Sequence, residues 1–149
     1  KCAAFMAVGC LVYRIGSSNI NDIEGIGKRM PWTMAAFVVA SLSLIGIPLT
    51  AGFIGKWYLV ISAFEQGWWW VLLSLLLAGS LSVIYLWRII EKAYFSDSNP
   101  QPLTVKEPPL LMLVPLLMVA AASIYFGIST TFSAGIAAQG AAAILGVSL

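Results

Sequence analysis

The stretch that decides the fold is Ser41-Leu-Ser-Leu-Ile-Gly-Ile-Pro-Leu-Thr-Ala-Gly-Phe-Ile-Gly-Lys56, in which one lysine follows a long run without charge. It lies inside an apolar run from Pro31 to about residue 66. As one straight helix that run would exceed about 50 Å, whereas the hydrocarbon core of a bilayer is roughly 30 Å thick. Pro48 cannot donate to the helical ladder and disfavours helical geometry in the residue before it. The run therefore predicts either one membrane crossing broken near Gly46–Thr50 or two helices forming a hairpin.

The composition of the whole chain points to a membrane. Hydrophobic residues make up 60% of the 149 residues and charged residues 9%. Soluble domains usually carry about 25% charged and roughly 45–50% apolar residues, so much of this chain must face lipid. In lipid a helix satisfies its own backbone, which predicts an all-α, polytopic transmembrane helix bundle. The net charge of +2 is too small to suggest nucleic acid, and no basic patch interleaved with aromatic residues appears, so we expect no nucleic-acid partner.

The charge-free stretches predict where the helices lie. We expect one membrane domain over 1–149, with helices at about 1–15, 31–47 and 51–66 (the two halves of the broken helix), 69–94 and 109–127, and room for another at 130–147. The chain enters an apolar run directly after Lys1, without an initiator methionine or a signal peptide. We therefore interpret the sequence as a fragment that begins within a helix.

Positive charge distinguishes the broken crossing from the hairpin. In a broken crossing, the loops 14–30 and 88–107 share one side of the membrane, and the opposite side carries no lysine or arginine. In a hairpin this bias disappears. Because cytoplasmic loops are enriched in lysine and arginine, the pattern favours the broken crossing and places both loops in the cytoplasm.

Lys56 is the strongest candidate for chemistry. A lysine inside a membrane span costs about 2.5–3.5 kcal/mol and usually marks an ion or proton path. It lies nine residues before Glu65, roughly 14 Å along a helix, which is too deep for its ammonium to reach the surface easily. Burial disfavours the charged ammonium, and the positive end of the second half-helix would act in the same direction. The alternative is a lysine that pairs with a carboxylate only to hold helices together.

Other residues are weaker candidates for the same path. Lys1 lies thirteen residues before Arg14, roughly 20 Å along a helix, and is either a second proton station near mid-membrane or merely the edge of the fragment. Glu65 is a candidate for proton uptake or release at the membrane surface. Broken helices expose carbonyls and half-helix ends that bind ions or water, although a plain proline kink is the alternative. The candidate water-binding residues around the break are Pro48, Thr50, Ser41 and Ser43.

Motifs for local catalysis are missing from the sequence. The chain has no histidine, which removes the usual metal ligand and the usual general base near neutral pH. It also has no phosphate-binding loop, dinucleotide fingerprint, Cys–His zinc pattern or iron–sulfur spacing. We therefore expect no catalytic residue, no metal and no cofactor, and a transporter subunit rather than a local catalytic centre.

The run from Ser41 through Lys56 to Trp57-Tyr-Leu59 closely resembles the signature of the antiporter-like subunits. These occur in respiratory NADH dehydrogenase (complex I), in membrane-bound hydrogenases and in Mrp-type Na⁺/H⁺ antiporters. The opening Lys1-Cys-Ala-Ala-Phe-Met-Ala-Val-Gly9 and the linker Ile23-Glu-Gly-Ile-Gly-Lys-Arg-Met-Pro31 are similar as well, so the resemblance covers about 1–95. The order of residues looks closest to the D-type subunit of the Mrp-type Na⁺/H⁺ antiporters, and complex I subunits remain a close alternative.

The resemblance implies a fold of fourteen transmembrane helices with two inverted five-helix repeats, of which this chain would be the C-terminal part. Lys56 matches the lysine of the family's second broken helix, and Lys1 matches the lysine of the helix before it. This implies proton translocation or monovalent cation:proton antiport through buried lysines and water, with protons and Na⁺ as transported ions and other subunits as partners in a cell inner membrane. The alternatives are a proton-pumping subunit of an NADH-quinone oxidoreductase or hydrogenase, and a structural membrane scaffold. The family's first repeat, with its glutamate–lysine pair, is absent, so this piece alone could not complete a proton path.

Overall fold

A computed structural model describes residues 1–95, 106–129 and 135 of the chain. Every regular element in these residues is helical, and none is a strand. Apart from Gly135, the helix predicted at 130–147 lies outside the described residues. The elements are α1 (Cys2–Ile15), the 3₁₀ turn η1 (Ile20–Ile23), α2 (Ile26–Arg29), α3 (Pro31–Ile45), α4 (Ala51–Glu65), α5 (Trp69–Phe95) and α6 (Leu110–Ile128).

The boundaries of α3 follow from its sequence. Pro31 occupies the first helical position, where its missing N–H costs no hydrogen bond. At the other end Gly46 adopts the left-handed conformation (φ 88°), which glycine reaches without strain. The N–H groups of Gly46 and Ile47 both donate to the carbonyl of Leu42, at 3.0 and 3.1 Å. The helix therefore ends just before Pro48, where the chain cannot continue it.

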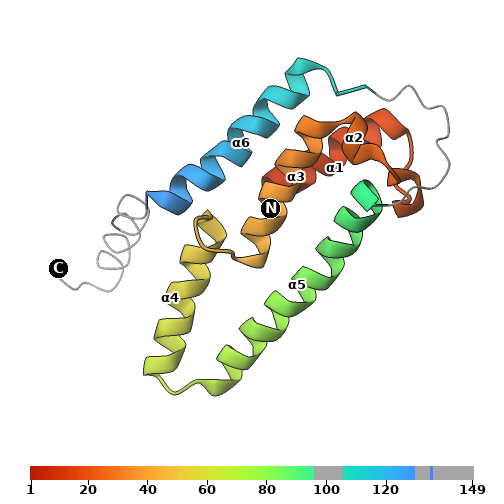
Figure 1. Cartoon of the computed structure of the whole chain (residues 1–149). Helices are drawn as coiled ribbons and strands as arrows, with labels where there is room; N and C mark the ends of the chain where they lie inside the picture. The colour runs from red at the N-terminus through yellow and green to blue at the C-terminus, as the bar shows by residue number, and fades with distance from the viewer. Residues whose placement is uncertain (96–105, 130–134, 136–149) are drawn as a thin grey trace.

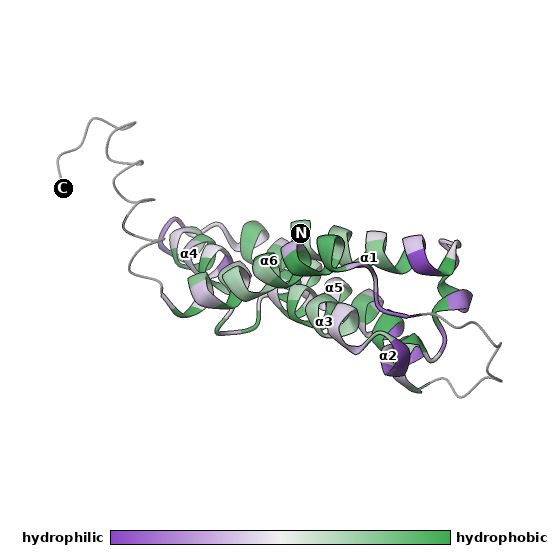
Figure 2. Ribbon diagram, turned by 90° about the horizontal axis from the view of Figure 1, so that it is seen from above, coloured by the Kyte–Doolittle hydropathy of each residue, from purple (hydrophilic) through white to green (hydrophobic). Residues whose placement is uncertain are grey.

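Helices α5 and α6 are long and apolar enough to cross a membrane, with 27 and 19 residues. Large apolar side chains stand on their outer faces: Trp70 is 84% exposed and Leu111 is 89% exposed. Figure 2 shows hydrophobic residues along the helices and hydrophilic ones concentrated around α2 and the nearby end of α1. Such faces suit lipid as the surrounding solvent.

Figure 1 shows that α3 and α4 run in the same general direction, with α4 displaced sideways where the chain breaks. Helix α5 returns in the opposite direction beside α4, and α6 packs against α1, α3 and α4. Two half-helices that run in the same direction are what the broken-crossing prediction requires, and their path through a membrane stays a prediction. The core lies between α1, α3 and α6, and the fully buried Cys10, Met34 and Leu116 belong to it.

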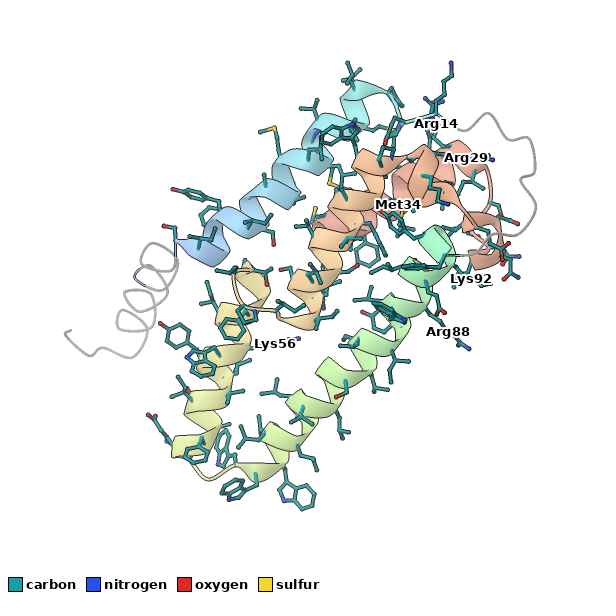
Figure 3. All side chains as sticks on the ribbon, viewed as in Figure 1. Arg14, Arg29, Met34, Lys56, Arg88 and Lys92 are labelled. Atoms are coloured by element: carbon teal, nitrogen blue, oxygen red, sulfur yellow. The ribbon has the colours of Figure 1, made fainter. Side chains whose placement is uncertain are left out.

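The polar segment 14–30 is more structured than a loop. It contains η1 and α2, and its apolar residues Ile26 and Met30 are buried in the core. Its link to the end of α5 is direct, because Lys92 donates to the side-chain oxygen of Asn21. The end of α5 therefore lies against segment 14–30, and Figure 3 shows Arg14, Arg29, Arg88 and Lys92 on one side of the molecule.

Candidate functional site at the helix break

The break segment, residues 46–50, connects α3 to α4 through an unusual backbone. Leu49 has a φ of 77°, a left-handed conformation that costs a residue with a side chain about 1–2 kcal/mol. Thr50 is extended, is nearly buried, and donates its hydroxyl to the carbonyl of Ile47 at 2.7 Å. Pro48 is exposed. A strained residue of this kind persists only where its surroundings hold it in place.

The side chain of Lys56 reaches back from α4 across the break segment to the end of α3 (Figure 3). Its ammonium nitrogen donates to the carbonyl oxygens of Leu44, at 2.7 Å, and Ile45, at 2.8 Å. The last carbonyls of a helix have no partner within it, and they form the negative end of the helix dipole. Lys56 therefore caps α3, and the half-buried ammonium is stabilised by that end. An ammonium has three donors, and the described hydrogen bonds use two of them.

This geometry corrects the expected electrostatics of Lys56. The sequence predicts that the ammonium lies under the influence of the positive end of α4, which disfavours charge. In the structure its hydrogen bonds go to the negative end of α3 instead. Among the described residues its hydrogen-bond partners are these backbone carbonyls, and no carboxylate is paired with it. The interpretation of Lys56 as half of a carboxylate pair therefore has no support in the described part of the chain.

Close backbone contact makes this reach possible. A Cβ atom on Gly52 would lie 1.9 Å from the carbonyl oxygen of Ser43, so the first turn of α4 touches the last turn of α3 directly. A Cβ atom on Gly46 would lie 2.9 Å from Cδ of Lys56. Both glycines therefore clear the space in which the lysine lies along the end of α3.

The hydroxyl groups near the break segment differ in what they bind. Ser41 is fully buried and donates to the carbonyl of Phe37 in its own helix, at 2.8 Å. Ser43 links elements instead: its oxygen accepts the N–H of Gly52 at 3.2 Å and the hydroxyl of Ser123 in α6 at 3.1 Å. Of the serines predicted to bind water, Ser43 is thus the one that joins both half-helices to a third helix.

Lys1 and Glu65 lie apart from this site. Lys1 is exposed at the start of α1. Glu65 is exposed at the end of α4 that is remote from the break segment. No hydrogen bond or ion pair joins either residue to Lys56 among the described residues. Their roles as a second proton station and as a surface group remain predictions.

Helix α6 supplies two residues that were not predicted from the sequence. Ser123 contacts Ser43, and Gly127 lies so close to the break segment that a Cβ atom on it would sit 2.4 Å from the carbonyl oxygen of Leu49. Ser123 and Gly127 are four residues apart and therefore share a helix face. Small residues at this spacing in an apolar helix are a known signal of close helix packing, so the pattern was available in the sequence.

Glu107 is a third residue that was not predicted, at the opposite end of α3. One carboxylate oxygen accepts the N–H of Trp32 at 2.8 Å, and the other accepts the hydroxyl of Thr33 at 2.7 Å. The carbonyl of Glu107 accepts two bonds from the guanidinium of Arg14. A carboxylate thus caps the positive end of α3 while the ammonium of Lys56 caps the negative end, the arrangement that the helix dipole favours.

The sequence defines the class of protein to which this site belongs. Residues 1–82 match the sequence model of the family described as NADH:quinone oxidoreductase/Mrp antiporter, transmembrane. The match includes Lys1, the break segment and Lys56, and it covers more than half of the chain. The chain therefore belongs to this family of antiporter-like membrane proteins.

Particular relatives carry a more specific name. The chain is 36% identical over 141 residues to NADH-quinone oxidoreductase subunit N of Desulforudis audaxviator, covering 86% of this chain and 28% of that protein. It is 31% identical over 129 residues to NADH-quinone oxidoreductase subunit N 2 of Solidesulfovibrio magneticus, covering 83% and 28%. It is 34% identical over 126 residues to NADH-quinone oxidoreductase subunit N of Moorella thermoacetica, covering 82% and 26%. The chain thus spans about a quarter of the length of these relatives.

Proposed function

We propose that this chain is part of a proton-translocating, antiporter-like subunit of a multisubunit membrane complex, and that Lys56 takes up and releases protons at the break segment. The observation that carries the proposal is the ammonium held on the carbonyls of Leu44 and Ile45. The family and the names of the relatives support an NADH-quinone oxidoreductase as the complex. Other subunits of that complex would then be the partners.

The geometry suggests how Lys56 would exchange a proton. Two donors of the ammonium are held by carbonyls, and the third would donate to water. Losing the proton removes the positive charge that the end of α3 favours, so the neutral amine would be held less strongly. Protonation would restore the attraction. The charge state of Lys56 and its hold on α3 are therefore linked.

The remaining parts of the path belong to the same proposal. Lys1 would pass protons laterally through water, and Glu65 would exchange them at the membrane surface. Water would be bound near the break segment by the hydroxyls of Ser43 and Thr50. The whole subunit would have fourteen helices in the bilayer of a cell inner membrane, with segments 14–30 and 88–107 in the cytoplasm.

A second candidate function is monovalent cation:proton antiport with Na⁺. The observation that favours it is the family itself, whose description includes the Mrp antiporters. Proton movement that requires Na⁺ on the opposite side of the membrane, in vesicles without a respiratory substrate, would support this candidate. Proton movement that follows NADH oxidation and ignores Na⁺ would support the NADH-quinone oxidoreductase.

The decisive experiment separates transport from a structural scaffold. Proton uptake is measured in inverted vesicles that carry the full-length subunit in its complex, for wild type, Lys56→Ala and Lys56→Arg, with assembly checked alongside. We expect both variants to assemble and to lose most proton uptake, because alanine has no donor and arginine does not release its proton. Wild-type uptake in Lys56→Ala would show that the lysine is only a structural charge.

A further inference from the structure

We infer that Ser123, in the last described helix, is a positioning residue for Lys56. The inference rests on the proposed function and adds a residue that lies outside the matched region 1–82. Ser123 does not touch Lys56 in any described hydrogen bond. It acts through Ser43, whose oxygen accepts the Ser123 hydroxyl at 3.1 Å.

Ser43 is the point where the two half-helices are joined. It lies one residue before Leu44 and two before Ile45, the residues that hold the ammonium. Its side-chain oxygen also accepts the N–H of Gly52, in the first turn of α4. That N–H is one of the helix N-terminal donors that have no partner within the helix. Ser43 therefore fixes the position of the end of α3 relative to the beginning of α4, and the hydrogen bond from Ser123 fixes the side chain of Ser43.

Gly127 keeps α6 against the same place. A Cβ atom on Gly127 would lie 2.4 Å from the oxygen of Leu49 and 2.5 Å from Cα of Thr50, so no side chain fits between α6 and the break segment. Leu49 is the strained residue, and strain of this kind requires support from its surroundings. Helix α6 therefore packs directly against the break segment at Gly127 and holds Ser43 in place by the hydrogen bond from Ser123.

The position of α4 relative to α3 decides whether Lys56 reaches its carbonyls. Lys56 lies four residues after Gly52, so a shift of the first turn of α4 moves the ammonium by a similar amount. Its hydrogen bonds of 2.7 and 2.8 Å would not survive a shift of about 1 Å as well-formed bonds. Loss of the Ser123 hydroxyl would thus weaken the hold on Lys56 without changing the lysine.

The experiment uses the full-length subunit in its complex and compares Ser123→Ala, Ser123→Thr, Ser43→Ala and the double alanine variant. Ser80→Ala is the matched control, because Ser80 is exposed and, among the described residues, donates to Leu76 in its own helix. Proton uptake is measured together with hydrogen–deuterium exchange of the peptide that covers residues 50–57. We expect Ser123→Ala to slow proton uptake about fivefold and to speed exchange in that peptide, with the double variant no worse than the worse single variant. Ser123→Thr, which keeps the hydroxyl, should restore both.

Two outcomes would overturn the inference. One is a Ser123→Ala variant that matches Ser80→Ala in proton uptake and in exchange. The other is additive loss in the double variant, with Ser123→Thr as slow as Ser123→Ala, because separate defects of packing would then explain the result. The Lys56 variants keep the two proposals apart: if Lys56→Ala retains transport, the proposed function fails, while the exchange measurement still tests whether Ser123 positions α4.

Discussion

The ammonium nitrogen of Lys56 lies 2.8 Å from the backbone carbonyl oxygen of Ile45, so a residue of α4 caps the helix that precedes it. This relationship crosses the break segment and joins the two half-helices by a charged hydrogen bond. It also means that Lys56 has a structural contribution that is separable from any role in transport. The first prediction measures that contribution.

Lys56→Met should lower the thermal stability of the purified complex, because the carbonyls of Leu44 and Ile45 lose their charged donor. Hydrogen bonds to a charged group contribute about 1.5–3 kcal/mol each, and a loss of about 2 kcal/mol in total is expected after relaxation. Lys56→Arg should lose less, since it keeps a cation and several donors. Dissociation of the subunit on heating measures the effect. Equal melting temperatures of Lys56→Met and wild type would show that the two hydrogen bonds of Lys56 do not contribute to stability.

Gly52→Ala should prevent normal assembly of the subunit. The added methyl group would lie 1.9 Å from the carbonyl oxygen of Ser43, which is backbone and cannot turn away. Gly55→Ala is the matched control in the same helix, because nothing lies within 4 Å of its Cβ position and alanine is favoured over glycine in helices by about 1 kcal/mol. The amount of assembled complex in the membrane is the measurement. Normal assembly of Gly52→Ala would mean that α3 and α4 do not touch at this point.

Glu107 and Thr33 should show energetic coupling. Glu107→Ala removes the cap from α3 and leaves the buried Thr33 hydroxyl without its partner, at a cost of about 1–3 kcal/mol. Thr33→Val alone should cost less, because the N–H of Trp32 keeps its carboxylate partner. A double-mutant cycle on the melting of the complex measures the coupling, and strictly additive effects would argue against the contact. Glu91→Ala serves as a control for removal of an exposed carboxylate.

Leu49→Gly should stabilise the folded subunit or leave it unchanged. Leu49 is 68% exposed and strained at φ 77°, so glycine relieves about 1 kcal/mol of strain and gives up little buried surface. Leu59→Gly is the contrasting variant: Leu59 is also exposed but lies inside α4, where glycine costs about 1 kcal/mol. The two variants are compared by the resistance of the complex to heat and to proteolysis. A Leu49→Gly variant as weak as Leu59→Gly would indicate that the leucine side chain has a partner.

Local signals allowed much of the fold to be predicted from the sequence. The break at residues 46–50 follows from Gly46 and Pro48, because these residues end a helix through their local backbone geometry, whatever the tertiary structure around them. The long apolar helices follow from composition in the same way. The short helices η1 and α2 were not predicted, because the polar residues around a few apolar ones, such as Ile26 and Met30, made the segment resemble a loop. Those residues are ordered by contacts with the rest of the bundle, which no local pattern contains.

The candidate site could be predicted only in part for the same reason. Lys56 stood out as a lone charge, which is a property of the sequence. The direction of its side chain depends on how α4 is displaced beside α3, and that displacement is set by Gly52 and by α6. Ser123 and Glu107 lie 80 and 74 residues from their partners Ser43 and Thr33, so only the folded chain reveals their roles.

These separations also bear on the order in which the protein is made. While the ribosome synthesises the chain, Lys56 follows Ile45 by 11 residues and can cap one end of α3 soon after that helix leaves the insertion machinery. The carboxylate for the other end, Glu107, is made 74 residues after Thr33. Until then the first turn of α3 must find other acceptors, such as lipid headgroups or water. The segment that carries Glu107 is therefore expected to complete the folding of α3 during biogenesis, and chains truncated before Glu107 should enter the membrane yet remain open to membrane quality-control proteases.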